Sequence, residues 1–75
     1  MIELGIYRHY KGNLYEVLGM AKHSETVEDM VIYKALYGAC ETWVRPASMW
    51  NELVEVDGKQ VKRFTLEAKT PQGAI

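Results

Sequence analysis

The sequence predicts an all-β domain built as a small barrel of five or six short antiparallel strands. Three observations predict it. Short segments alternate apolar and polar residues, glycine-containing turns separate them at regular spacing, and no segment has convincing helical periodicity. The chain has 75 residues, the size of one domain. We therefore expect residues 1–75 to form a single unit, with a flexible tail over residues 68–75.

The first two strands are predicted as a hairpin around the stretch RHYKGN. Residues 6–10 alternate in the manner of a strand, and Gly12 then provides the backbone freedom of a tight turn. A longer strand is predicted over residues 14–23. Gly19 lies inside it and predicts a bulge or a sharp bend.

The remaining strands follow an acidic segment, residues 24–29, which we expect to be a loop with at most one helical turn. A strand over residues 30–37 is β-branched and closed by a glycine. The next, over residues 42–45, is stopped by Pro46, which donates no hydrogen bond to a sheet. Two further strands, one ending at residue 56 and one over residues 61–67, are predicted to be joined by a turn at Asp57-Gly58.

Composition bounds the function and the compartment. The single Cys40 excludes an internal disulfide, and no signal peptide or membrane-length apolar run is visible, so a cytoplasmic location is expected. The formal net charge of −1 argues against sequence-independent binding of nucleic acid. Cations concentrate at the two ends and carboxylates in the middle. No metal framework, phosphate loop or carboxylate pair is present, so we expect no cofactor, no metal and no enzymatic activity.

Several motifs occur in order between Gly5 and Phe64: GIYRHYKGNLYEVLGMAKHSET, VIYKALYG, WVRPASMW and RF. Together they resemble a family of short bacterial proteins that is known only as a domain of unknown function, number 1653. The resemblance implies an SH3-like β-barrel and implies no reaction. The usual family pattern has Phe where Trp50 stands and Pro where Lys62 stands.

The motif WVRP gives the leading binding hypothesis. Trp43 and Arg45 lie two residues apart and therefore on one face of a strand. Both residue types are enriched in binding hot spots, and Arg beside Trp suits a carboxylate or a phosphate. The alternative is that Trp43 is the central core aromatic while Arg45 pairs with an acidic neighbour such as Glu41 or Glu52.

Other aromatic and cationic residues are weighed in the same way. In the first hairpin, Tyr10 either packs against Tyr15 or forms a ligand platform with its cationic neighbours. Tyr33 and Tyr37 are expected on one face of a strand, where they line either a groove or the core. His23 could bind an anion when protonated. The candidate ligand-binding residues are Arg8, Tyr10, Lys11, His23, Tyr33, Tyr37, Trp43 and Arg45.

The predicted function is a binding module that recognises a peptide, a protein or a small anionic ligand through an aromatic and arginine surface. One alternative is a single-stranded nucleic-acid binding domain, and another is an accessory domain that docks on a larger enzyme. Cations gathered around exposed aromatics would favour nucleic acid, whereas carboxylates among those cations would favour a protein partner. A monomer or a weak dimer is expected.

Overall fold

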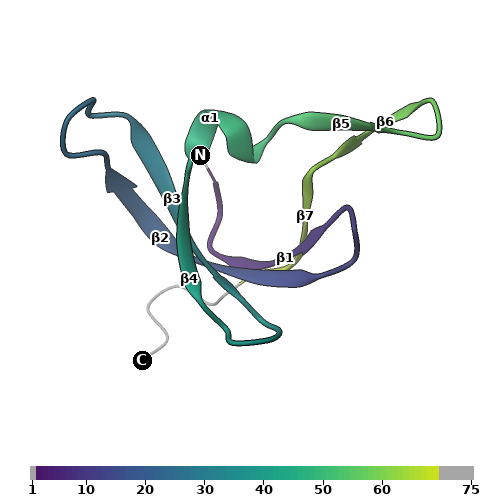
Figure 1. The fold of residues 1–75 in the computed structure, drawn as a ribbon, viewed down its shortest axis with the longest axis horizontal. Helices are drawn as coiled ribbons and strands as arrows, with labels where there is room; N and C mark the ends of the chain where they lie inside the picture. Colours follow the sequence, from purple (N-terminus) through teal and green to yellow (C-terminus); the bar gives the residue numbers. More distant parts are fainter. Residues whose placement is uncertain (1, 70–75) are drawn as a thin grey trace.

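The computed structural model describes residues 2–69, which contain seven strands and one helical turn (Figure 1). In chain order the elements are β1 (Gly5–His9), β2 (Leu14–Lys22), β3 (Asp29–Ala35), β4 (Thr42–Pro46), α1 (Ala47–Trp50), β5 (Leu53–Val56), β6 (Lys59–Lys62) and β7 (Phe64–Lys69). No helix among these residues is long and apolar enough to span a membrane.

Five of the strands form one antiparallel sheet in the order β4-β3-β2-β1-β7, and β5 and β6 form a separate hairpin. The all-β prediction is confirmed. The prediction of a closed barrel of five or six strands is wrong, because within residues 2–69 no pairing joins β4 to β7. Closure fails for a local reason: α1 carries the chain off the sheet directly after β4, and β5 then pairs with β6.

The turn between β5 and β6 is the predicted one. Asp57 and Gly58 have φ angles of 52° and 79°, the left-handed pair that a two-residue hairpin turn requires, and Val56 pairs with Lys59. Arg63 separates β6 from β7, so the single predicted strand over residues 61–67 is two strands. Residues 68 and 69, predicted as tail, belong to β7; residues 70–75 of that prediction lie outside the described residues.

A bulge in β2 lies where Gly19 predicted one. The register of β2 against β3 shifts between Val17 and Gly19, so Leu18 is the extra residue. The shift reverses the alternation beyond it. Met20 therefore pairs with the buried Val31 and shares its face of the sheet, instead of pointing to the opposite face.

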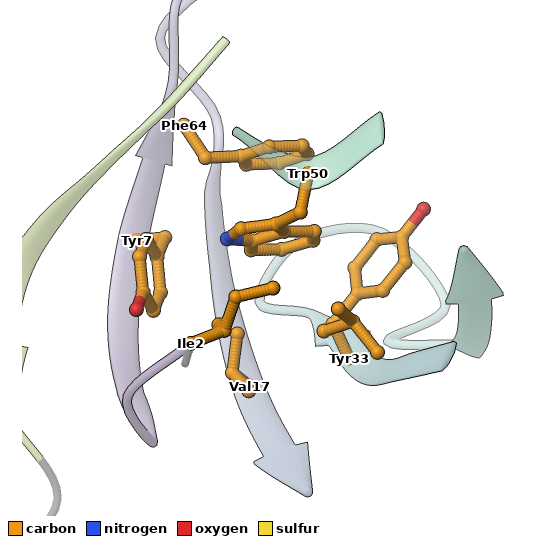
Figure 2. Close-up of a cluster of buried hydrophobic side chains, with 7 residues drawn as sticks. Ile2, Tyr7, Val17, Tyr33, Trp50 and Phe64 are labelled. Carbon is orange, nitrogen blue, oxygen red and sulfur yellow. The ribbon is translucent and has the colours of Figure 1, made fainter. Parts of the chain in front are cut away.

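The core lies on one face of the five-stranded sheet, which we call the inner face. Tyr7, Val17, Val31, Tyr33 and Phe64 are buried there on four adjacent strands. The single turn of α1 places Trp50 over this face, and Figure 2 shows its indole stacked between Phe64 and Ile2. Trp50 is 1% exposed and is the largest fully buried side chain among the described residues.

Candidate binding site

Phe64 is the floor of an aromatic and cationic cluster on the inner face. It lies at the start of β7, directly opposite His9 on β1. The His9 and Tyr15 rings meet it edge-on, with ring centroids 5.0 and 5.7 Å away. The Cζ atom of Arg45, on β4, lies over the same ring at 5.8 Å from its centroid. We call His9, Tyr15, Arg45 and Phe64 the Phe64 cluster.

Arg45 has no acidic partner among residues 2–69. Its Nε atom is buried and makes no hydrogen bond there. Glu52, one of the predicted partners, lies 3.4 Å from Arg63 instead, and Arg8 lies 2.8 Å from Glu67. Within the described part of the chain, Arg45 is thus the arginine whose charge no carboxylate offsets, and an aromatic ring lies beneath it.

The pKa of His9 is affected by this positive charge. Its pKa lies below the ordinary value of 6.5, first because burial disfavours the charged ring and then because Arg63, Lys11 and Arg45 repel a proton. The Nδ1 atom of His9 accepts a hydrogen bond from the backbone N–H of Lys11 at 3.2 Å. The imidazole is therefore neutral at neutral pH. A bound anion would offset the positive charges of Arg63, Lys11 and Arg45 around it.

Tyr15 and Tyr37 are joined through their hydroxyl groups, whose oxygens are 2.6 Å apart. Burial, followed by the hydrogen bond to Tyr37, raises the pKa of Tyr15 to about 12. Tyr15 also contacts the ring of Tyr33 edge-on. Tyr37 lies beyond the end of β3, so the prediction that Tyr33 and Tyr37 share one strand is wrong. Tyr15 connects them instead.

Trp43 lies beside this cluster and is 50% exposed. It pairs with Tyr33 across β3 and β4, which places it on the inner face together with Arg45. With Ala35, Tyr37 and Glu41 it lines a shallow hollow of about 210 Å³ at the β3–β4 turn. The alternative that Trp43 is the central core aromatic is therefore wrong, and Trp50 occupies that position.

The other predicted site residues are not brought to the Phe64 cluster as ligand contacts. Tyr33 is 8% exposed and belongs to the core. Arg8 is bound to Glu67. Tyr10 packs on His9 and not on Tyr15, with Lys11 over its ring. His23 accepts hydrogen bonds from the backbone N–H groups of the β2–β3 turn that it closes, at 3.1 Å from Glu25.

Carboxylates pair with three cations that bear on the nucleic-acid alternative, which stays a prediction. Arg8 and Arg63 each face a glutamate, and Lys22 is paired with Asp29 at the end of the β2–β3 hairpin. Carboxylates thus lie beside these three cations. Among residues 2–69, no three His, Cys, Asp or Glu side chains come together as a metal site.

Three members of the Phe64 cluster are absent from the predicted ligand-binding residues: His9, Tyr15 and Phe64. The stretch RHYKGN predicts the correct hairpin, but its alternation does not indicate what the imidazole of His9 contacts. The partner of His9 is Phe64 on β7, which depends on a pairing between the two ends of the chain. The RF motif was the available signal.

The fold and this cluster define a small antiparallel β domain with an uncompensated arginine over an aromatic floor. The chain belongs to the family described as Protein of unknown function (DUF1653), which matches residues 5–66. It is similar to a crystal structure of a protein of the same family from Bordetella bronchiseptica, with 36% identity over 95% of each chain and a TM-score of 0.83. Comparison with the curated proteins gives no match.

Proposed function

We propose that this domain is a binding module that recognises the carboxylate or phosphate group of a peptide, protein or small ligand through the Phe64 cluster. The observation that carries the proposal is Arg45. Its guanidinium lies over Phe64 with a buried, unpartnered Nε, and no carboxylate of residues 2–69 offsets its charge. A guanidinium that forms no ion pair within residues 2–69 favours an external acceptor for its charge, because charge-assisted hydrogen bonds are among the strongest available to a protein.

The residues around Arg45 favour the binding of an anion over the binding of a cation. His9 meets the same ring edge-on, and its pKa is lowered first by burial and then by the positive charges of Arg63, Lys11 and Arg45. The hydroxyl of Tyr15, whose ring also meets Phe64, is hydrogen-bonded to the hydroxyl of Tyr37, and one O–H of this pair is left to donate to a ligand. Together these groups offer both charge and directional hydrogen bonds to an oxyanion.

The hollows of the described surface are small. The hollow beside Trp43 has about 210 Å³ and one lined by Ile2, Met20 and Asp29 among others has about 340 Å³, below or at the lower end of the roughly 300–1,000 Å³ of typical small-molecule pockets. A ligand here would lie on an open aromatic surface and not in a water-excluded cavity. Such a surface is consistent with the SH3-like arrangement implied by the family resemblance, which stays a prediction, and with recognition of an extended peptide.

The proposal is tested by titrating the uniformly ¹⁵N-labelled domain with inorganic phosphate and with acetate at constant ionic strength. We expect saturable shifts of the Arg45 Nε–H and His9 ring resonances. Arg45→Gln should weaken binding by about tenfold or more, because a hydrogen bond to a charged group contributes about 1.5–3 kcal/mol. Arg8→Gln is the matched control, since it removes an arginine already bound to Glu67. Equal titrations of the Arg45 variant and the native domain would refute the proposal.

A further inference from the structure

The far side of β4 is a free sheet edge within the described residues, because β4 pairs with β3 alone. Natural edge strands are usually protected by charge, bulges or cover. Here the centre of the edge is apolar on both faces: Trp43 is exposed on the inner face, and Val44 is 62% exposed on the outer face. The other edge, β7, carries Glu67 and Lys69.

The register fixes which backbone groups of β4 face outward. Ala35 N–H donates to the Glu41 carbonyl at 3.0 Å, so Ala35 and Glu41 form a hydrogen-bonded pair. Antiparallel pairs alternate, so the backbone groups of Trp43 and Arg45 point to β3 and those of Thr42 and Val44 point to the edge. Pro46 falls on an outward position, where its missing N–H leaves the sheet intact.

The inner face of this edge is complementary to itself. Glu41, Trp43 and Arg45 alternate along it as acid, aromatic and base. If a second copy is laid antiparallel with Trp43 opposite Trp43, each Arg45 falls opposite a Glu41. The same alignment sets Thr42 opposite Val44, so each of these pairs exchanges both of its backbone hydrogen bonds.

From this pattern we infer that β4 is the contact through which two copies of the chain associate, on a two-fold axis at Trp43. The interface is isologous, so each Glu41 approaches the partner's Arg45, which forms no ion pair with a carboxylate of residues 2–69 of its own chain. The paired strand β4 has five residues in each copy, against the roughly 20–30 residues per partner of a standard interface. The dimer is therefore weak and forms only at high protein concentration.

Dimer formation competes with anion binding, because the partner's Glu41 offsets the same guanidinium that the ligand would use. This competition rests on the proposed function, whereas the dimer itself does not. Phosphate should therefore shift the equilibrium toward the monomer, and dilution should expose Arg45 to a ligand. Arg45 would then leave Glu41 of the second copy and bind an acidic partner instead.

Disulfide trapping tests the register directly, in a Cys40→Ser background. Trp43→Cys should cross-link on mild oxidation, because residues in a non-hydrogen-bonded pair have Cα atoms about 4.5 Å apart, within the range a disulfide spans. Thr42→Cys is the matched control. It faces the partner's Val44, so its two copies are offset by two residues along the strands and lie beyond the roughly 7 Å limit for bridging.

Sedimentation equilibrium of the native domain, with and without phosphate at matched ionic strength, completes the test. We expect a concentration-dependent dimer that phosphate weakens. Glu41→Arg should weaken it by about tenfold or more, because it places like charges directly opposite each other at both ends of the contact.

The outcomes separate the two proposals. A monomer at all concentrations with no cross-link at residue 43, or a cross-link at residue 42 instead, overturns the dimer and leaves anion binding to its own titration. A dimer that is indifferent to phosphate, while phosphate still shifts the Arg45 resonance, overturns the competition. If phosphate shifts neither Arg45 nor the dimer equilibrium, the competition and the proposed function both fail.

Discussion

The ring of Phe64 lies parallel to the indole of Trp50, with an interplanar angle of 1° and ring centroids 3.8 Å apart. Figure 2 shows that this stack continues into the core, where the indole nitrogen of Trp50 points toward the ring of Tyr7. The two rings meet edge-on at 5.3 Å, so a π face lies where the buried Nε1 has no other acceptor. Phe64 therefore supports Arg45 while it is itself supported by the largest core side chain.

The two tryptophans are expected to differ sharply in their effect on stability. Trp50→Ala should lower the free energy of unfolding by about 3–5 kcal/mol, because it empties the centre of a small core. Trp43→Ala is the matched control and should change it by no more than about 0.5 kcal/mol, since half of its side chain is exposed. Urea denaturation followed by far-ultraviolet circular dichroism measures both. Loss of the cooperative transition in the Trp43 variant would contradict the assignment.

Fluorescence offers an independent check on the same assignment. In Trp43→Phe the remaining indole is Trp50, whose emission should be shifted to the blue and weakly quenched by acrylamide. In Trp50→Phe the remaining indole is Trp43, which should emit at longer wavelength and be readily quenched. Acrylamide is neutral, so it does not compete at the cationic cluster as iodide would. Similar quenching of the two variants would be inconsistent with the fold.

Glycine at position 5 is expected to be indispensable. Its φ is 153°, and a Cβ placed there would lie 2.3 Å from the carbonyl oxygen of Ala68 on β7. Gly5→Ala should therefore lower the free energy of unfolding by at least about 1–3 kcal/mol, since it adds a backbone clash to a strained conformation. Gly19→Ala is the control, because nothing lies within 4 Å of its Cβ position. Thermal melts of both variants would show whether only the first is destabilised.

The stability of the domain should depend on pH through His9. Its pKa is lower in the folded chain than the ordinary 6.5, so below that value the unfolded chain takes up a proton first. The free energy of unfolding should therefore fall as the pH drops through 6.5, and the loss should be complete once the pH is below the folded pKa of His9. In His9→Gln this part of the pH dependence should disappear, whereas His23→Gln should retain it. The pKa of the Glu67 carboxyl is lowered by the hydrogen bond from Arg8, so the stability that this carboxyl contributes is present above 4.5 and is lost only as the pH falls below that value.

Anion binding should raise the pKa of His9, because a bound oxyanion opposes the repulsion from Arg45 and Arg63. Phosphate should accordingly bind more tightly as the pH falls, provided that its own ionisation is accounted for. An NMR titration of the His9 ring, in a His23→Gln background with and without phosphate, measures this shift. An unchanged His9 pKa at saturating phosphate would place the anion elsewhere on the molecule.

The features that the sequence predicted correctly are local ones. The β2 bulge at Gly19 and the two-residue turn at Asp57 and Gly58 each depend on backbone freedom at one position, which a residue type reveals. The common face of Trp43 and Arg45 follows from strand periodicity alone. Barrel closure depends on which distant strands pair: the Asp57-Gly58 turn predicts that β5 and β6 pair with each other, but no residue type in that segment indicates that the hairpin stays separate from the five-stranded sheet.

The candidate site was predicted in part for the same reason. Arg45 was identified from its neighbour, but the ring beneath it belongs to β7, and His9 reaches that ring through a pairing of the two ends of the chain. Tyr37 was placed on the wrong element because the chain turns before it. Gly38 and Cys40 both take positive φ values in the β3–β4 turn, and the sequence alone did not indicate how early β3 would end.

The position of Cys40 has a practical consequence. It is the single thiol in the chain, it is exposed, and it borders the hollow that Trp43 lines. A maleimide-linked fluorophore could therefore be attached to the native sequence without engineering a residue. The indole of Trp43 would quench its emission, and a change in emission would report the binding of a ligand or a second copy at this end of β4.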